Sequence, residues 1–201
     1  CLLSGKLSQV GRNRFSSISA YLYPMNALRY LALIAFFAAS AIPSAVQCDE
    51  LDFRLKDLDG NPIALEKSLG SHLTVVCFIG TECPLAKLYS GRLGKLAEKF
   101  PQVDFIAVSS NQQDSIEELK AFRERFNVSI PIVKDVANLV ADQFEAERTP
   151  EVFLVNEDLE ILYRGRIDDQ YQPGIAKRNP TRDDLMIAIS ECLADGKPSV
   201  T

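Results

Sequence analysis

A buried strand that runs directly into a helix is the feature that most constrains how this chain folds. The segment 73–79 is apolar and rich in β-branched residues, and a glycine lies near each of its ends, which is typical of a central strand. Beyond Pro84, apolar side chains recur at helical spacing as far as Phe100. Proline suits a first helical position because its missing N–H would have no partner inside the helix. The pattern predicts a strand–loop–helix unit with Cys83 at the helix N-terminus.

The predicted position of Cys83 favours a reactive thiol. Free N–H groups and the positive end of the helix dipole both stabilise a thiolate at a helix N-terminus. Cysteines in such places have pKa values of about 3.5–7.5 instead of about 8.5. We therefore expect Cys83 to act as a nucleophile near neutral pH.

The remaining patterns predict an α/β domain. A second apolar run, 103–108, lies one helix length after the first, and a connection of that length joins parallel strands. A turn at Asp59-Gly60 separates two short strand patterns and indicates a β-hairpin. The expected elements are a hairpin at 53–57 and 63–65, helices at 115–126 and 136–144, a second hairpin at 152–155 and 161–163, and a closing helix over 185–193.

Charge separates the first 41 residues from the remainder. They hold four basic residues and no acid, which leaves 18 basic against 27 acidic residues in the rest of the chain, a net charge of −9. This balance does not favour nucleic acid or an anionic membrane surface as a partner. The chain is 47% hydrophobic and 24% charged, so we expect one globular domain with additional segments.

Residues 25–41 have the anatomy of a secretory signal. Met25 and Arg29 precede a short apolar block that ends in small residues. A membrane anchor or a buried helix is the alternative, although the block is short for a bilayer span. We expect export to the periplasm or beyond, with 1–24 a misassigned extension, 25–41 the signal peptide, 42–49 a linker, 50–195 the domain and 196–201 a C-terminal tail. Lipid tethering at Cys48 is a weaker alternative, because Gln47 before it is not small.

Two separated motifs resemble the thioredoxin-like superfamily. The segments Phe78-Ile79-Gly80-Thr81-Glu82-Cys83-Pro84 and Arg148-Thr149-Pro150-Glu151-Val152-Phe153-Leu154-Val155 look like its redoxin branch, the alkyl hydroperoxide reductase/thiol-specific antioxidant, or peroxiredoxin-like, family. The resemblance covers residues 50–195. It implies an α/β thioredoxin-like fold, with a central mixed β-sheet flanked by helices and an N-terminal β-hairpin.

The resemblance also implies where a substrate binds. In thioredoxin-like proteins the proline at the position of Pro150 is cis and faces the active cysteine, so the backbone of Thr149 can pair with an extended substrate beside Cys83 and Pro84. A trans bond in an ordinary turn is the alternative, because only about 5–6% of bonds before proline are cis.

Departures from the family patterns narrow the chemistry. A dithiol thioredoxin has a second cysteine where this chain has Ala86, so a group attached to Cys83 must be released by another thiol. A typical peroxiredoxin has Pro-x-x-x-Thr-x-x-Cys, where this chain has Val76 and Gly80. Thr81 lies one residue closer to the cysteine and is our candidate for contact with a peroxide oxygen.

Charged residues near the motifs have a functional and a plain interpretation. Arg148 is the candidate for the arginine with which peroxiredoxins favour the thiolate and polarise peroxide. Lys87 is a second candidate cation, and both can equally be solvated surface charges. Glu82 is expected to be an exposed acid. The pair Asp168-Asp169 is expected in a solvated loop, with calcium or substrate contacts as the alternative.

The other cysteines and the histidine offer little chemistry of their own. Cys77 and Cys192 lie on apolar faces and are expected in the core, where free cysteines are common. Cys48 stays open as a resolving thiol. His72, the single histidine, has no companion at metal-ligand spacing, so we expect neither a metal nor another cofactor.

The leading functional hypothesis is an exported thiol-dependent oxidoreductase with antioxidant, peroxiredoxin-like activity. Cys83 would attack peroxide, form a sulfenic acid and be reduced by an external thiol, with Thr81 and Arg148 as catalytic partners. One alternative is a thiol–disulfide reductase that acts through a mixed disulfide, and another is a non-catalytic scaffold that docks an extended partner at Thr149–Pro150. The expected partners are a peroxide or disulfide and an external thiol reductant, without nucleic acid or metal, and the oligomeric state stays open.

Overall fold

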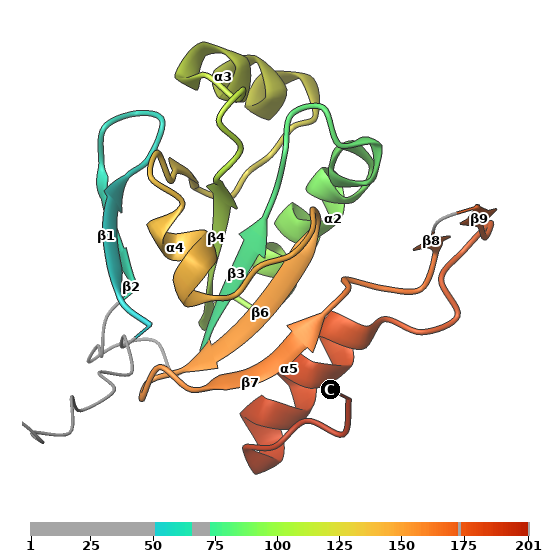
Figure 1. The fold of residues 1–201 in the computed structure, drawn as a ribbon. Coiled ribbons are helices and arrows are strands. Elements are labelled where there is room, and N and C mark those ends of the chain that lie inside the picture. The colour runs from blue at the N-terminus through green and yellow to red at the C-terminus, as the bar shows by residue number, and fades with distance from the viewer. Residues whose placement is uncertain (1–50, 66–72, 173, 201) are drawn as a thin grey trace, which may run out of the picture. The chain divides into compact units, whose positions relative to one another are not determined.

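A five-stranded mixed β-sheet forms the centre of the part of the chain that the computed structural model describes, residues 51–65, 73–172 and 174–200 (Figure 1). The sheet order is β5-β4-β3-β6-β7, with β3, β4 and β5 parallel and β6 antiparallel to both of its neighbours. The strands are β3 (Leu73–Phe78), β4 (Val103–Ser109), β5 (Ile132–Lys134), β6 (Glu151–Asn156) and β7 (Ile161–Gly165). The expected mixed sheet is confirmed, whereas the expected extension, signal peptide and linker, with Cys48 and His72, lie outside the described residues.

The central strand β3 has the burial that its apolar sequence predicts. Each of its residues except Thr74 is buried. Cys77 lies opposite Ala107 of β4 and Val152 of β6 and has no exposed surface. Burial raises the pKa of the Cys77 thiol, so this cysteine is a core residue and not a second nucleophile.

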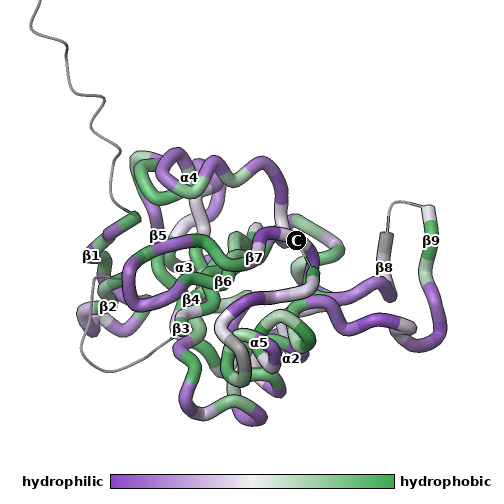
Figure 2. Tube along the Cα trace, turned by 90° about the horizontal axis from the view of Figure 1, so that it is seen from below, coloured by the Kyte–Doolittle hydropathy of each residue, from purple (hydrophilic) through white to green (hydrophobic). Residues whose placement is uncertain are grey.

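Helices cover both faces of the sheet. One face packs against α2 (Pro84–Lys99), α3 (Ile116–Arg125) and α5 (Asp184–Asp195), and the other against α4 (Leu139–Gln143) and the N-terminal hairpin. Side chains alternate between the two cores along β6, since Leu154 belongs to the first and Phe153 to the second. Figure 2 shows the apolar stretches of β3, β4 and β6 between α4 on one side and α2 and α5 on the other.

The predicted N-terminal β-hairpin is present, formed by β1 (Phe53–Lys56) and β2 (Pro62–Leu65). The carboxylate of Asp57 accepts hydrogen bonds from the N–H groups of Asp59 and Asn61 at 2.9 and 2.8 Å. Gly60 adopts a φ of 91°, which a residue with a side chain rarely adopts. These contacts make the turn that the Asp59-Gly60 pair predicts.

The predicted helices are present with shifted ends. α3 begins at a capping box between Ser115 and Glu118. α4 is shorter than the predicted 136–144 because Asn138, with a φ of 58°, interrupts the helical backbone before it. The closing helix α5 is present, and Val200 beyond it packs into the core.

Three short strands were not predicted. β5 has only three residues, and β8 (Tyr171–Gln172) and β9 (Ile175–Ala176) form a two-stranded hairpin that projects away from the main sheet (Figure 1). Runs of two or three residues are too short to show the alternation that identifies a strand.

Candidate active site

Cys83 lies at the strand–helix junction that the sequence predicts. It is the N-cap residue of α2, with an extended backbone (φ −69°, ψ 117°), and Pro84 is the first helical residue. The N–H of Ala86 donates to Sγ of Cys83 at 3.5 Å, so a free donor of the first helical turn points at the sulfur. The side chain is half-buried, which leaves the sulfur within reach of a substrate.

The loop before β6 faces this sulfur. The Thr149–Pro150 peptide bond is cis, as the resemblance implies. Sγ of Cys83 donates to the carbonyl oxygen of Thr149 at 3.0 Å. Residues 66 positions apart in the sequence are thus brought together at one end of the sheet, with Pro84 exposed beside them.

Asp114 holds the loop that carries Cys83. Its buried carboxylate accepts from the hydroxyl and the N–H of Thr81, at 2.5 and 3.2 Å, and from the hydroxyl of Ser109 and the amide of Asn111, at 2.8 and 3.2 Å. Burial by itself would raise the pKa of Asp114, but these donors outweigh it and hold the pKa below its ordinary value. The hydroxyl of Thr81, our candidate for contact with a peroxide oxygen, therefore donates its hydrogen bond to the carboxylate of Asp114.

Asn111 also lies against Gly80, so a side chain at position 80 would require Asn111 to move. A Cβ atom added there would lie 2.3 Å from Nδ2 of Asn111, which is far inside van der Waals contact. The place where a typical peroxiredoxin carries threonine is thus occupied by the Asn111 side chain, which Asp114 holds in position.

Arg148, the candidate cation, lies beside Thr149 with its side chain 68% exposed. Its guanidinium pairs at 3.5 Å with Glu151, a residue without exposed surface, and Arg164 contacts the same carboxylate through Nε at 3.0 Å. Burial by itself would raise the pKa of Glu151, but the N–H of Glu147 and the two guanidinium groups outweigh it and lower the pKa. Lys87 is half-buried and Glu82 is exposed, as expected for the latter.

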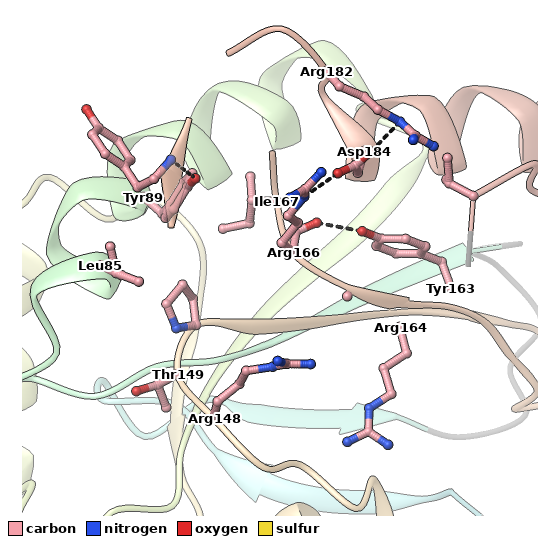
Figure 3. A pocket seen from close by; sticks show the side chains of 14 residues that line it. Leu85, Tyr89, Arg148, Thr149, Tyr163, Arg164, Arg166, Ile167, Arg182 and Asp184 are labelled. Carbon is pink, nitrogen blue, oxygen red and sulfur yellow. Dashed lines mark hydrogen bonds and ion pairs between the residues drawn. The ribbon is translucent and has the colours of Figure 1, made fainter. Parts of the chain in front are cut away.

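A cavity of about 640 Å³ is lined in part by Thr149, the residue whose carbonyl oxygen accepts from Cys83 (Figure 3). Thr149 and Pro150 line it on one side, and Leu85 and Tyr89 of α2 on another. The remaining wall comes from β7, the segment after it and the start of α5. Four arginines contribute to the lining: Arg148, Arg164, Arg166 and Arg182.

The expectation of a solvated loop at Asp168-Asp169 is wrong, because their exposed fractions are only 1% and 5%. Asp168 accepts from the hydroxyl of Tyr89 at 2.6 Å and pairs with Arg92, both on α2. Asp169 accepts from the N–H of Thr181 at 2.7 Å. Both carboxylates are therefore buried, and each is hydrogen-bonded to residues that lie at least 12 positions away in the sequence.

Asp114 and Asn111 are the site residues that the sequence did not reveal. Both follow β4, and the carboxyl ends of neighbouring parallel strands meet at one edge of a sheet. Their place directly after the second predicted strand was thus the available signal. Among the described residues, no group of three or more His, Cys, Asp or Glu side chains could hold a metal ion, and no helix is long and apolar enough to span a membrane.

The fold and the site together define a thioredoxin-like redoxin with one cysteine, Cys83, at the N-terminus of α2. The AhpC/TSA family model matches residues 46–164, so the chain belongs to that family, as the two sequence motifs indicate. The chain is 30% identical over 138 residues to the thiol-disulfide oxidoreductase ResA of Halalkalibacterium halodurans, covering 68% of this chain and 76% of that protein. This similarity supports an oxidoreductase, and it does not support the narrower expectation of a peroxiredoxin-like enzyme.

Solved structures agree on the fold. A hypothetical protein, SMc02350 of Sinorhizobium meliloti 1021, is 29% identical, with a TM-score of 0.66 over 75% of this chain and 85% of that one. A thioredoxin-like protein of Aeropyrum pernix is 19% identical, with a TM-score of 0.51 over 72% of this chain and 93% of that one, and this second likeness shows the fold alone.

Proposed function

We propose that this chain is a thiol–disulfide oxidoreductase that forms a mixed disulfide at Cys83 and depends on an external thiol to release it. The observation that carries the proposal is the placement of the half-buried Cys83 sulfur between the N-terminus of α2 and the Thr149 carbonyl, with Ala86 where a resolving cysteine would stand. Similarity to a protein named as a thiol-disulfide oxidoreductase supports it.

The chemistry proceeds in two exchanges. The Cys83 thiolate attacks one sulfur of a substrate disulfide, so that a Cys83–substrate disulfide forms and the other half leaves as a thiolate and takes up a proton. An external dithiol then attacks the mixed disulfide, releases the second half as a thiol and ends as a disulfide itself. The substrate gains two electrons, the dithiol loses two, and Cys83 is regenerated.

The protein stabilises the sulfur in both exchanges. The Ala86 N–H and the positive end of α2 favour negative charge on Sγ when Cys83 attacks and again when it leaves. Among the described residues the other cysteines do not serve as resolving thiols in this proposal, since Cys77 is buried in β3 and burial raises the pKa of Cys192 on α5.

Disulfide exchange is favoured over peroxide reduction by the engagement of the two expected partners. The hydroxyl of Thr81 donates to Asp114, and the guanidinium of Arg148 pairs with Glu151. A peroxide oxygen that accepts from the Thr81 hydroxyl would have to take this donor from the buried Asp114 carboxylate, at the cost of a hydrogen bond to a charged group worth about 1.5–3 kcal/mol.

A direct test compares three proteins: the full reduced chain, Cys83→Ser, and Cys192→Ser as a control that removes a different half-buried thiol. Each is mixed with 2-hydroxyethyl disulfide, and the Cys83 peptide is examined by mass spectrometry before and after addition of dithiothreitol. We expect an adduct of one substrate half on Cys83, absent in Cys83→Ser, retained in Cys192→Ser and removed by the dithiol.

A parallel reaction with hydrogen peroxide separates the remaining functions. Sulfenic acid formation at Cys83 that is faster than the disulfide reaction would favour the peroxidase and contradict the proposal. No reaction with either oxidant would leave a binding scaffold.

We also infer export, from the charged start, apolar block and small-residue ending of residues 25–41. Expression of the full chain in a bacterial host should place the protein in the periplasmic fraction, and deletion of 31–38 should keep it in the cytoplasm. Equal distribution of the two proteins would contradict export.

A further inference from the structure

The cavity beside Cys83 has a basic wall built around one buried carboxylate. Asp184, whose side chain is 8% exposed, contacts Arg166 through Nε at 2.5 Å and Arg182 through Nε at 2.6 Å (Figure 3). Both contacts use Nε, so the terminal nitrogens of the two guanidinium groups are not the atoms that make these contacts with Asp184. Two arginines thus share one carboxylate and keep donors available.

The lining of this wall holds more cations than anions. Two guanidinium groups stand against one carboxylate there, whereas Asp169 and Glu191, which interact electrostatically with Arg166 and Arg182, do not line the cavity. Tyr163, which also lines the cavity, adds no negative charge at neutral pH, because burial and the nearby Asp184 raise its pKa to about 12. On the opposite side, Arg148 is mostly exposed and only loosely paired at 3.5 Å (Figure 3).

Buried contacts hold this wall in place. The N–H of Arg182 donates to Asp169 at 3.0 Å, and the N–H of Asp169 donates back to the Arg182 carbonyl at 3.1 Å. Lys177 also pairs with this carboxylate, and these donors lower the pKa of Asp169. Arg182 therefore belongs to a fixed backbone, and a pre-formed pair of guanidinium groups favours binding of a planar carboxylate.

We propose that the Arg166–Asp184–Arg182 wall binds a carboxylate of the disulfide substrate, so that the preferred substrate is a small disulfide whose halves each carry a carboxylate. The inference depends on the proposed function of Cys83. Thr149 and Pro150 line the same cavity, and the Thr149 carbonyl oxygen also contacts Sγ of Cys83, so one half can lie in the cavity while its sulfur reaches Cys83. A volume of about 640 Å³ lies within the range of about 300–1,000 Å³ typical of small-molecule sites.

The proposed exchange keeps the bound half on the protein. The Cys83 thiolate attacks the sulfur of the half whose carboxylate lies on Arg166 and Arg182, the substrate S–S bond breaks, and the other half leaves as a thiolate and is protonated. An external dithiol then frees the bound half as a thiol and is itself oxidised to a disulfide.

Three disulfides of similar size and different charge test the proposal: 3,3′-dithiodipropionate with two carboxylates, 2-hydroxyethyl disulfide with none, and cystamine with two ammonium groups. The rate of adduct formation on the Cys83 peptide of the full chain is measured for each by mass spectrometry. We expect the dianion to react at least about tenfold faster than the neutral disulfide, the factor that one charge-assisted contact provides, and the dication to react slowest.

Single variants locate the effect. Arg166→Gln and Arg182→Gln each leave Asp184 one partner, and each should lower the ratio of the dianion rate to the neutral rate by about threefold to tenfold. Arg166→Lys and Arg182→Lys should restore part of the ratio. Arg123→Gln is the matched control, because Arg123 pairs with Asp59 outside the cavity, and its ratio should equal that of the wild type. A ratio taken on one preparation is independent of the fraction that is folded.

The outcomes distinguish this inference from the function on which it depends. If 2-hydroxyethyl disulfide gives no adduct on Cys83, the proposed function fails and the inference with it. If the neutral disulfide reacts but the ratio is near one, or survives both glutamine variants, only the carboxylate site is refuted. Faster reaction of a disulfide-bridged peptide without acidic residues would assign the cavity to protein substrates and overturn the choice of a small disulfide.

Discussion

The substitution Asp114→Asn tests whether one buried carboxylate organises the loop that carries Cys83. Four donors from three residues, Thr81, Ser109 and Asn111, point at this carboxylate, at 2.5 to 3.2 Å. A hydrogen bond to a charged acceptor contributes about 1 kcal/mol more than one to a neutral acceptor, so loss of the charge costs about 4 kcal/mol at most. The neutral amide is easier to bury and can donate to the Thr81 hydroxyl, which reduces the expected loss to about 2 kcal/mol.

The loss should depend on pH in a defined direction. The pKa of Asp114 is lower in the folded protein than in the unfolded chain, so its charge stabilises the fold above the unfolded pKa and ceases to do so as the pH falls through the folded pKa. Thermal unfolding of wild type and Asp114→Asn at pH 7 should differ by about 4–8 °C. The difference should shrink as the pH falls below about 4, where Asp114 takes up a proton in the unfolded chain before it does so in the folded protein.

A local measurement separates loop order from general stability. Hydrogen exchange of the peptide over residues 79–86 should accelerate in Asp114→Asn, since the Thr81 N–H loses its charged acceptor. Asp135→Asn is the matched control, because Asp135 is also buried but accepts from Ser110 and Ala141. Asp135→Asn should lower the stability of the folded protein, but it should leave hydrogen exchange of the 79–86 peptide as slow as in the wild type. Equal stability of wild type and Asp114→Asn at pH 7, or a difference that does not shrink in acid, would refute the reasoning.

Three further substitutions have defined outcomes. Ala86→Cys should let the mixed disulfide on Cys83 resolve without an added thiol, which is measured as release of the second substrate half in the absence of reductant, and retention of the adduct would contradict the one-thiol interpretation. Glu151→Gln should lower the free energy of unfolding by about 2–3 kcal/mol, because two arginines lose their buried partner. The difference in the free energy of unfolding between wild type and Glu151→Gln should narrow below about pH 4, since the pKa of Glu151 is lowered in the folded protein. Denaturant titrations that show the same difference at pH 7 and in acid would contradict this prediction. Tyr89→Phe removes the hydroxyl that donates to Asp168 at 2.6 Å and should cost about 1–3 kcal/mol in the same titration, and an unchanged midpoint would show that the contact contributes nothing.

Local sequence patterns predicted the part of the site that is built from neighbouring residues. The apolar run of β3, Pro84 at the first helical position and the following periodicity all lie within 30 residues, so they placed Cys83 at the N-terminus of α2. The position of Thr149 opposite the sulfur came from a resemblance, because no local pattern states which loop faces which.

Contacts between distant residues account for what the sequence did not show. Asp114 stands in a polar stretch typical of a loop, yet the Thr81 that it holds lies 33 residues earlier. The sequence predicts a solvated acid at Asp168, yet this residue is buried against Tyr89, which lies 79 residues away. A carboxylate is buried only when several donors converge on it, and convergence is a property of the fold.

The segment after β7 connects the reactive sulfur with the basic wall. Asp168 binds Tyr89 and Arg92 of α2, the helix that Cys83 caps, while the next residue, Asp169, holds the backbone of Arg182. Adjacent carboxylates thus hold α2 and the backbone of Arg182 through buried contacts. In the proposed cycle Ala86 stands where an internal resolving thiol would be, so the substrate half stays bound until an external thiol arrives. The proposed carboxylate site beside the mixed disulfide would hold the substrate half during that time.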